Sequence, residues 1–177
     1  MAKIFEIATR SFGADAEEPG ISALSRWISG RKQGPGDIIT YRIETSLRLQ
    51  ARITPPCAGG RFYADRLLEC IGGIEDGKLR GEPEIREEDA LMDAGTILTL
   101  CKRAWLAIPG PGMLPIADEY FHDSEEFQEG MARAYGDLMR TMRDAGIAGH
   151  VILTDDPGEI ELELLSAPRV LFFHPEP

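Results

Sequence analysis

Two adjacent aspartates and a histidine near the end of the chain are the residues with the most evident chemical potential. Asp155 and Asp156 follow the apolar run 151–154, and His174 follows the run 169–173. Short apolar runs are typical of buried parallel strands, whose carboxyl ends share the sheet edge where α/β proteins bind ligands. These candidate catalytic residues could hold a divalent metal or act as an acid–base pair. The simpler alternative makes Asp156 a helix cap and leaves Asp155 solvated.

A second candidate site lies in the polar stretch that begins at Asp118. His122 and Glu126 are four residues apart and would share a helix face if that helix began early enough. They are candidate metal ligands, with Asp118 or Glu119 completing the set. The alternative is a polar loop that leads into a capped helix.

Cations and glycine-rich segments suggest a third kind of site, one for anions. Backbone amides of 30–34 (GRKQG) and 110–112 (GPG) could contact an anion, with Arg31 and Lys32 assisting. Three further arginines share one face of segment 41–53 and could form an anion or partner surface: Arg42, Arg48 and Arg52. Ordinary turns would equally explain the glycines, and a charged face that discourages aggregation would explain the arginines.

No motif in the sequence identifies a reaction or a cofactor. The chain has no P-loop, no GxGxxG after a strand, no GxSxG elbow, no HExxH and no EF-hand loop. Its three cysteines are widely spaced and lack zinc spacing, which predicts free thiols rather than a disulfide framework. Cys70 and Cys101 lie in apolar periodic stretches, whereas Cys57 lies in a Pro-Pro-Cys-Ala-Gly-Gly loop and is predicted to be the reactive one.

Apolar spacing predicts the helices that would position these residues. Leucines, aromatics and methionines recur at helical intervals in four segments: 17–29, 62–71, 87–108 and 123–145. The third is ambiguous, because 96–100 alone could be a strand. Asp123 and Glu126 match a capping box at the start of the fourth, and Gly146 would end it. Asp156-Pro157-Gly158-Glu159 predicts a further short helix to Leu165, although that stretch also alternates like a strand.

Strands are predicted from alternation and from short apolar runs. Segment 3–8 reads as a first strand. Segment 41–53 alternates apolar odd with polar even positions, which predicts a long antiparallel strand with one solvated face. Together with the C-terminal runs, this predicts an α/β or α+β fold. We expect one domain, 1–177, with helices packed on a mixed sheet.

Charge limits the classes of partner. The net charge is −11, yet residues 1–61 carry nine Lys and Arg against six Asp and Glu, a net of +3. An acidic chain is a poor nucleic-acid binder, and no apolar run is long enough to cross a membrane. The N-terminal segment lacks the apolar stretch of a signal peptide, so we expect a cytoplasmic protein.

Two functions remain open from the sequence. The first is a non-catalytic binding or assembly protein that self-associates as a homodimer or small homo-oligomer, through the long strand 41–53 and opposite charges. The second is a small-molecule enzyme whose site contains Asp155, Asp156 and His174. A cleft with converging polar groups would favour the second, and a flat face buried between copies would favour the first.

Overall fold

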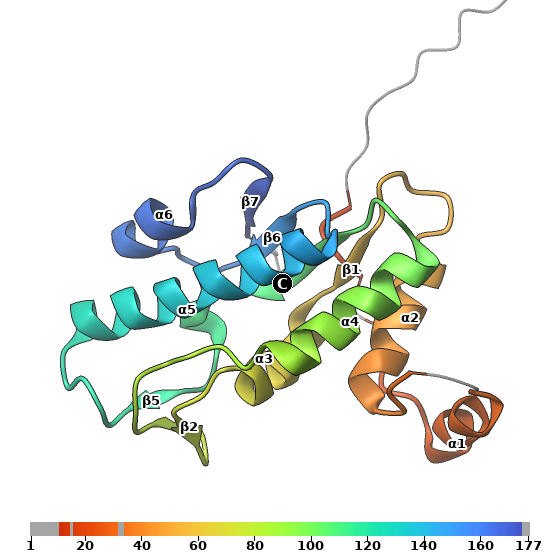
Figure 1. Ribbon diagram of the computed structural model, residues 1–177, viewed down its shortest axis with the longest axis horizontal. Helices are drawn as coiled ribbons and strands as arrows, with labels where there is room; N and C mark the ends of the chain where they lie inside the picture. The colour runs from red at the N-terminus through yellow and green to blue at the C-terminus, as the bar shows by residue number, and fades with distance from the viewer. Residues whose placement is uncertain (1–10, 15, 32–33, 175–177) are drawn as a thin grey trace, which may run out of the picture.

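The computed structural model describes residues 11–14, 16–31 and 34–174. Helices pack on a four-stranded parallel sheet, and a small three-stranded sheet lies beside them (Figure 1). The larger sheet has the order β1 (Cys57–Gly59), β4 (Trp105–Pro109), β6 (His150–Leu153), β7 (Val170–Phe173). The smaller sheet contains β2 (Ile74–Glu75), β3 (Lys78–Leu79) and β5 (Ala117–Asp118), with β2 antiparallel and β5 parallel to β3. The predicted α/β fold with parallel and antiparallel strands is confirmed.

Six α-helices and two 3-10 turns connect these strands in the described residues. They are α1 (Ile21–Gly30), α2 (Ile38–Leu49), α3 (Ala64–Cys70), α4 (Glu87–Leu100), α5 (Ser124–Ala145), α6 (Glu159–Leu165), η1 (Arg61–Tyr63) and η2 (Pro111–Met113). The helix predicted over 123–145 is confirmed as α5. The carboxylate of Asp123 accepts hydrogen bonds from the N–H groups of Glu125 and Glu126, and Gly146 ends the helix at a φ of 120°.

One face of the larger sheet is covered by α2, α4 and α5, and α4 and α5 cross in front of it in Figure 1. Leu106, Ile108 and Ile152 belong to the same buried core as the apolar sides of these helices. The opposite face carries Cys57, Trp105, Ala107, Val151 and Leu153, all buried. Because both faces of the central strands β4 and β6 are covered, these strands are apolar except for His150 at the start of β6, as expected of buried parallel strands.

The chain just before α1 crosses this second face of the sheet. The ring of Phe12 stacks on Phe173 of β7 with 4.2 Å between centroids. A Cβ added to Gly13 would lie 2.9 Å from the Cβ of Ala107, so only glycine allows so close a crossing.

The prediction of a long strand over 41–53 is wrong, because most of the segment is α2. The carboxylate of Asp37 caps this helix by accepting a hydrogen bond from the N–H of Thr40. Its buried apolar residues are Ile39, Ile43 and Leu47. Residues four apart share a face in a helix and in a strand alike, so this spacing satisfies both periods. The expected exposed strand edge therefore does not exist in this segment.

The helix predicted over 87–108 ends early. It stops at Leu100, and after a turn at Lys102 and Arg103 the chain enters β4. A short apolar run buried on both faces cannot be distinguished by periodicity from a buried stretch of helix. The alternative of a strand over 96–100 is also wrong, since these residues belong to α4.

The C-terminal strand–helix–strand unit is confirmed. β6 and β7 pair in parallel, and α6 connects them. The predicted cap is wrong, since α6 begins at Glu159 after Gly158 and no side chain caps it. The predicted first strand, 3–8, lies outside the described residues. Within the part of the chain that the structure describes, no helix is both long and apolar enough to span a membrane.

Candidate anion-binding pocket

A cavity of about 1050 Å³ lies among α1, α2 and α4. Its volume is slightly above the range that small-molecule sites occupy, about 300–1,000 Å³. Three of its lining side chains are arginines and one is a carboxylate: Arg26, Arg31, Arg48 and Glu44. We call this cavity the arginine pocket.

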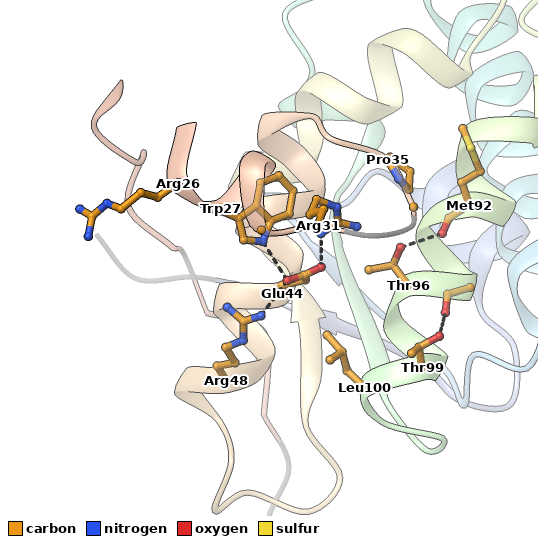
Figure 2. Close-up of a pocket in the computed structure, with 13 residues that line it drawn as sticks. Arg26, Trp27, Arg31, Pro35, Glu44, Arg48, Met92, Thr96, Thr99 and Leu100 are labelled. Carbon is orange, nitrogen blue, oxygen red and sulfur yellow. Dashed lines mark hydrogen bonds and ion pairs between the residues drawn. The ribbon is translucent and has the colours of Figure 1, made fainter. Parts of the chain in front are cut away.

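Glu44 of α2 organises the polar wall of the arginine pocket (Figure 2). Its Oε1 pairs with Nη1 of Arg31 at 2.5 Å, and its Oε2 pairs with Nη2 of Arg48 at 2.8 Å. The indole Nε1 of Trp27 donates a further hydrogen bond to Oε2 at 3.0 Å. Burial opposes ionisation of Glu44, but the hydrogen bonds from Arg31 and Trp27 outweigh it and hold the pKa below its usual range.

Arg31 is the most constrained of the three arginines. Its guanidinium carbon lies 4.2 Å from the centroid of the Trp27 ring, a cation–π contact. Its side chain is 15% exposed. Among the described residues its buried Nε has no hydrogen-bond partner. A buried donor without a partner is costly.

The wall opposite the arginines belongs to α4 and is mainly apolar. Met92 and Leu100 line it and are each 46% exposed, which is high for large apolar side chains. The hydroxyls of Thr96 and Thr99 donate to carbonyls of their own helix, those of Met92 and Gly95. The wall therefore presents apolar surface to the pocket.

Charge and shape together suit a ligand with an acidic group and an apolar body. Glu44 neutralises one of the two guanidiniums that it touches, so Arg31 and Arg48 retain positive charge. Arg26 adds a third cation at the rim, extending away from Glu44 in Figure 2. Guanidinium groups bind carboxylates and phosphates through paired hydrogen bonds. This concentration of cations is notable in a chain whose net charge is −11.

The arginine pocket brings together two arginines that the sequence assigned to different candidate sites. Arg31 was expected to assist a glycine loop, and Arg48 was expected on a charged strand face. The structure brings both onto Glu44. Arg42 lies elsewhere: its Nε donates to the carbonyl of Ala16, and its guanidinium stacks on Phe62. Lys32 lies outside the described residues. Nothing in the sequence showed that α4 would form the opposite wall.

The carboxyl edge of the larger sheet carries the predicted Asp155, Asp156 and His174. Parallel pairing of β6 with β7 puts all three after strands that end at this edge, and all three are exposed. His174 is tied to the edge by a 3.2 Å hydrogen-bond contact between its Nδ1 and the carbonyl of Thr154. Sequence reasoning missed Glu161 of α6, which is buried beside the edge with its Oε1 against Gly110. Burial raises the pKa of Glu161.

The structure gives the predicted metal ligands no support. His122 precedes α5 rather than lying on it, at a φ of 57°. Asp118 accepts hydrogen bonds from three backbone N–H groups of the loop, and Glu119 pairs with Lys78 and Arg80. Over residues 11–14, 16–31 and 34–174, no group of three or more His, Cys, Asp or Glu side chains is placed to hold a metal ion.

The cysteines are free thiols, as predicted, but the prediction that Cys57 is reactive is wrong. Cys57 lies in β1 rather than in a loop and is fully buried. Burial raises its pKa above the usual range for a thiol, and it raises that of Cys70 to about 12. Because the thiolate is the nucleophile, neither residue suits nucleophilic chemistry at neutral pH.

Comparison with known proteins supports the fold. No protein-family model matches the sequence, and no curated protein matches it significantly. The structure resembles a crystal structure from Listeria monocytogenes provisionally assigned as a vitamin-B12-independent methionine synthase, with a TM-score of 0.59 and 17% sequence identity. The match covers 97% of this chain and 65% of the other chain. The chain is thus similar in fold to about two thirds of that protein.

Proposed function

We propose that this protein binds a small organic anion in the arginine pocket. The observation that carries the proposal is the placement of Arg31 and Arg48 on the single carboxylate of Glu44, facing an apolar wall of α4. A ligand carboxylate or phosphate would replace part of the hydration of both guanidiniums. The apolar wall would take the body of the ligand.

A direct test uses anilinonaphthalene sulfonate, a fluorescent monoanion with an aromatic body. We expect saturable binding at one site of the native protein. Arg48→Gln should weaken it about tenfold or more, because a hydrogen bond to a charged group contributes about 1.5–3 kcal/mol. Arg133→Gln is the matched control. Arg133 is similarly exposed and also pairs with a glutamate four residues earlier, but on α5 and outside the pocket.

The outcomes separate specific binding from adsorption. Near-UV circular dichroism should be unchanged in both variants, because this dye also binds partly unfolded proteins. Equal weakening by Arg48→Gln and Arg133→Gln, or no saturable binding at all, would contradict the proposal.

The carboxyl edge of the larger sheet is the second candidate location. The parallel pairing of β6 with β7 favours it, and Asp155, Asp156 and His174 would be its acid–base residues. Amide chemical shifts recorded during the same titration distinguish the two locations. Changes clustered on α1, α2 and α4 support the arginine pocket, whereas changes clustered at these three residues would favour the edge.

A further inference from the structure

A second cavity of about 570 Å³ adjoins the arginine pocket. It lies between the carboxyl end of α2, with the segment that follows it, and the turn after α4. The two cavities have two lining residues in common, Arg48 and Leu100. These two side chains, one from α2 and one from α4, lie at the boundary between the cavities, and we call the two adjacent cavities together the α2–α4 groove.

The far end of the α2–α4 groove carries its own cations. Lys102 and Arg103 line the second cavity, and both are exposed. Neither forms an ion pair with any residue in the described part of the chain. No Asp or Glu is among the described residues that line this cavity. Along the whole groove, five lining side chains are cationic, and Glu44 is the one carboxylate among the described residues.

Apolar side chains line the α2–α4 groove beside its cations, and Arg48 lies with Leu100 at the boundary of the two cavities. Leu100 is at the junction and is 46% exposed, and Ile53 is 37% exposed in the second cavity. Pro55 and Pro56 also line this cavity and add apolar surface without N–H donors. Arg31 and Arg48 share one carboxylate and keep a net positive charge, and Lys102 and Arg103 form no ion pair with the described residues. Apolar surface beside these two cationic groups is complementary to a molecule with an acidic group at each end.

We propose that the ligand of this protein is an elongated dianion, an apolar chain or ring system with a carboxylate or phosphate at each end. One acidic group would meet Arg31 and Arg48, the other would meet Lys102 and Arg103, and the body would cross Leu100. This inference rests on the proposed function, because it extends the ligand of the arginine pocket into the second cavity. The chain carries a net charge of −11, and that negative surface disfavours a long polyanion such as nucleic acid.

The test compares straight-chain dicarboxylic acids with monocarboxylic acids of equal length, each competing with anilinonaphthalene sulfonate. Over a series of chain lengths, we expect one diacid to bind about tenfold more tightly than its monoacid, the effect of one added charge-assisted contact. The double variant Lys102→Gln/Arg103→Gln should remove this advantage and leave binding of the dye unchanged. The control Arg133→Gln/Arg140→Gln removes two exposed charges outside the groove and should keep the advantage.

Failure of this inference can be told from failure of the proposed function. If the dye and the monoacids bind but no diacid gains affinity at any length, the elongated dianion is wrong and the arginine pocket stands. The same holds if the advantage survives the Lys102→Gln/Arg103→Gln change. If neither the dye nor any acid binds, both proposals are wrong.

Discussion

His150 is a fully buried histidine in β6. Neither of its ring nitrogens has a hydrogen-bond partner among the described residues. Burial, with a smaller contribution from the charge of Arg143, lowers its pKa to about 3. The folded protein therefore keeps this imidazole neutral, whereas an unfolded chain protonates it with a pKa of about 6.5.

This difference predicts a loss of stability in mild acid. As the pH falls below about 6.5, His150 becomes protonated in the unfolded state but not in the folded state. The free energy of unfolding therefore falls by about 1.4 kcal/mol per pH unit. Between pH 7 and pH 5 we expect His150 to contribute a loss of about 2 kcal/mol. Urea unfolding gives the free energy of unfolding of the natural protein and of His150→Phe at both pH values. The contribution of His150 is the difference between the two proteins in the change of this free energy from pH 7 to pH 5.

The comparison isolates His150 from carboxyls that titrate in the opposite sense. Asp93 and Glu161 have pKa values that burial raises, so their contribution to stability grows as they become protonated. Asp93 and Glu161 are present in the natural protein and in His150→Phe, so their contributions cancel when the two proteins are compared. Identical pH slopes for the two proteins would show that His150 is accessible to protons in the folded state.

At the scale of elements, a single side chain ties α2 to the larger sheet. Gln50 directly follows α2 and is 4% exposed. Its Oε1 accepts the N–H of Cys57 at 2.9 Å, and its Nε2 donates to the carbonyls of Cys57 and Ser46 at 2.7 and 3.0 Å. The amide thus pairs with both backbone groups of the first residue of β1.

We expect Gln50→Ala to destabilise the protein by about 2 kcal/mol, because buried N–H and C=O groups of Cys57 would lose their partner. Gln128→Ala is the control. Gln128 is an exposed glutamine on α5 with one long hydrogen bond of 3.4 Å, and its removal should change stability by less than about 0.5 kcal/mol. Chemical denaturation of both variants measures the two values. If Gln50→Ala and Gln128→Ala have similar free energies of unfolding, water replaces the Gln50 side chain as the partner of Cys57 at β1.

At the scale of the whole molecule, the case for self-association has changed. The predicted edge strand over 41–53 is mostly helix α2 and offers no unpaired strand edge to a second copy. Uneven charge is the remaining reason to expect self-association. Residues 1–61 carry a net charge of +3 in a chain of net charge −11, so this basic part is complementary in charge to the acidic remainder of a second copy. We still expect a homodimer at low salt.

Light scattering at two salt concentrations checks this expectation. A dimer held by charge should dissociate in about 1 M salt, where the screening length falls to about 3 Å. A monomer at high micromolar concentration in low salt would contradict self-association. A dimer that persists in high salt would indicate an apolar interface instead of a charged one.

Local patterns in the sequence determined the elements from α5 to β7, apart from the cap of α6. The cap at Asp123 and the glycine at 146 bracket α5, and the apolar runs of β6 and β7 flank α6, all as predicted. Caps and helix stops act through hydrogen bonds between residues a few positions apart, so the sequence alone carries them. The parallel pairing that follows from this unit placed Asp155, Asp156 and His174 at one edge, also as predicted.

Tertiary structure alone decided the rest. Whether segment 41–53 is helix or strand depended on which residues find buried partners, since a four-residue spacing fits both. Cys57 is buried because it pairs with β4 and packs against residues of β4 and β6, which are distant from it in sequence. The arginine pocket needs α1, α2 and α4 packed together, and the partners of Arg31 and Arg48 come from that packing. Such contacts join residues distant in sequence, and no local pattern records them.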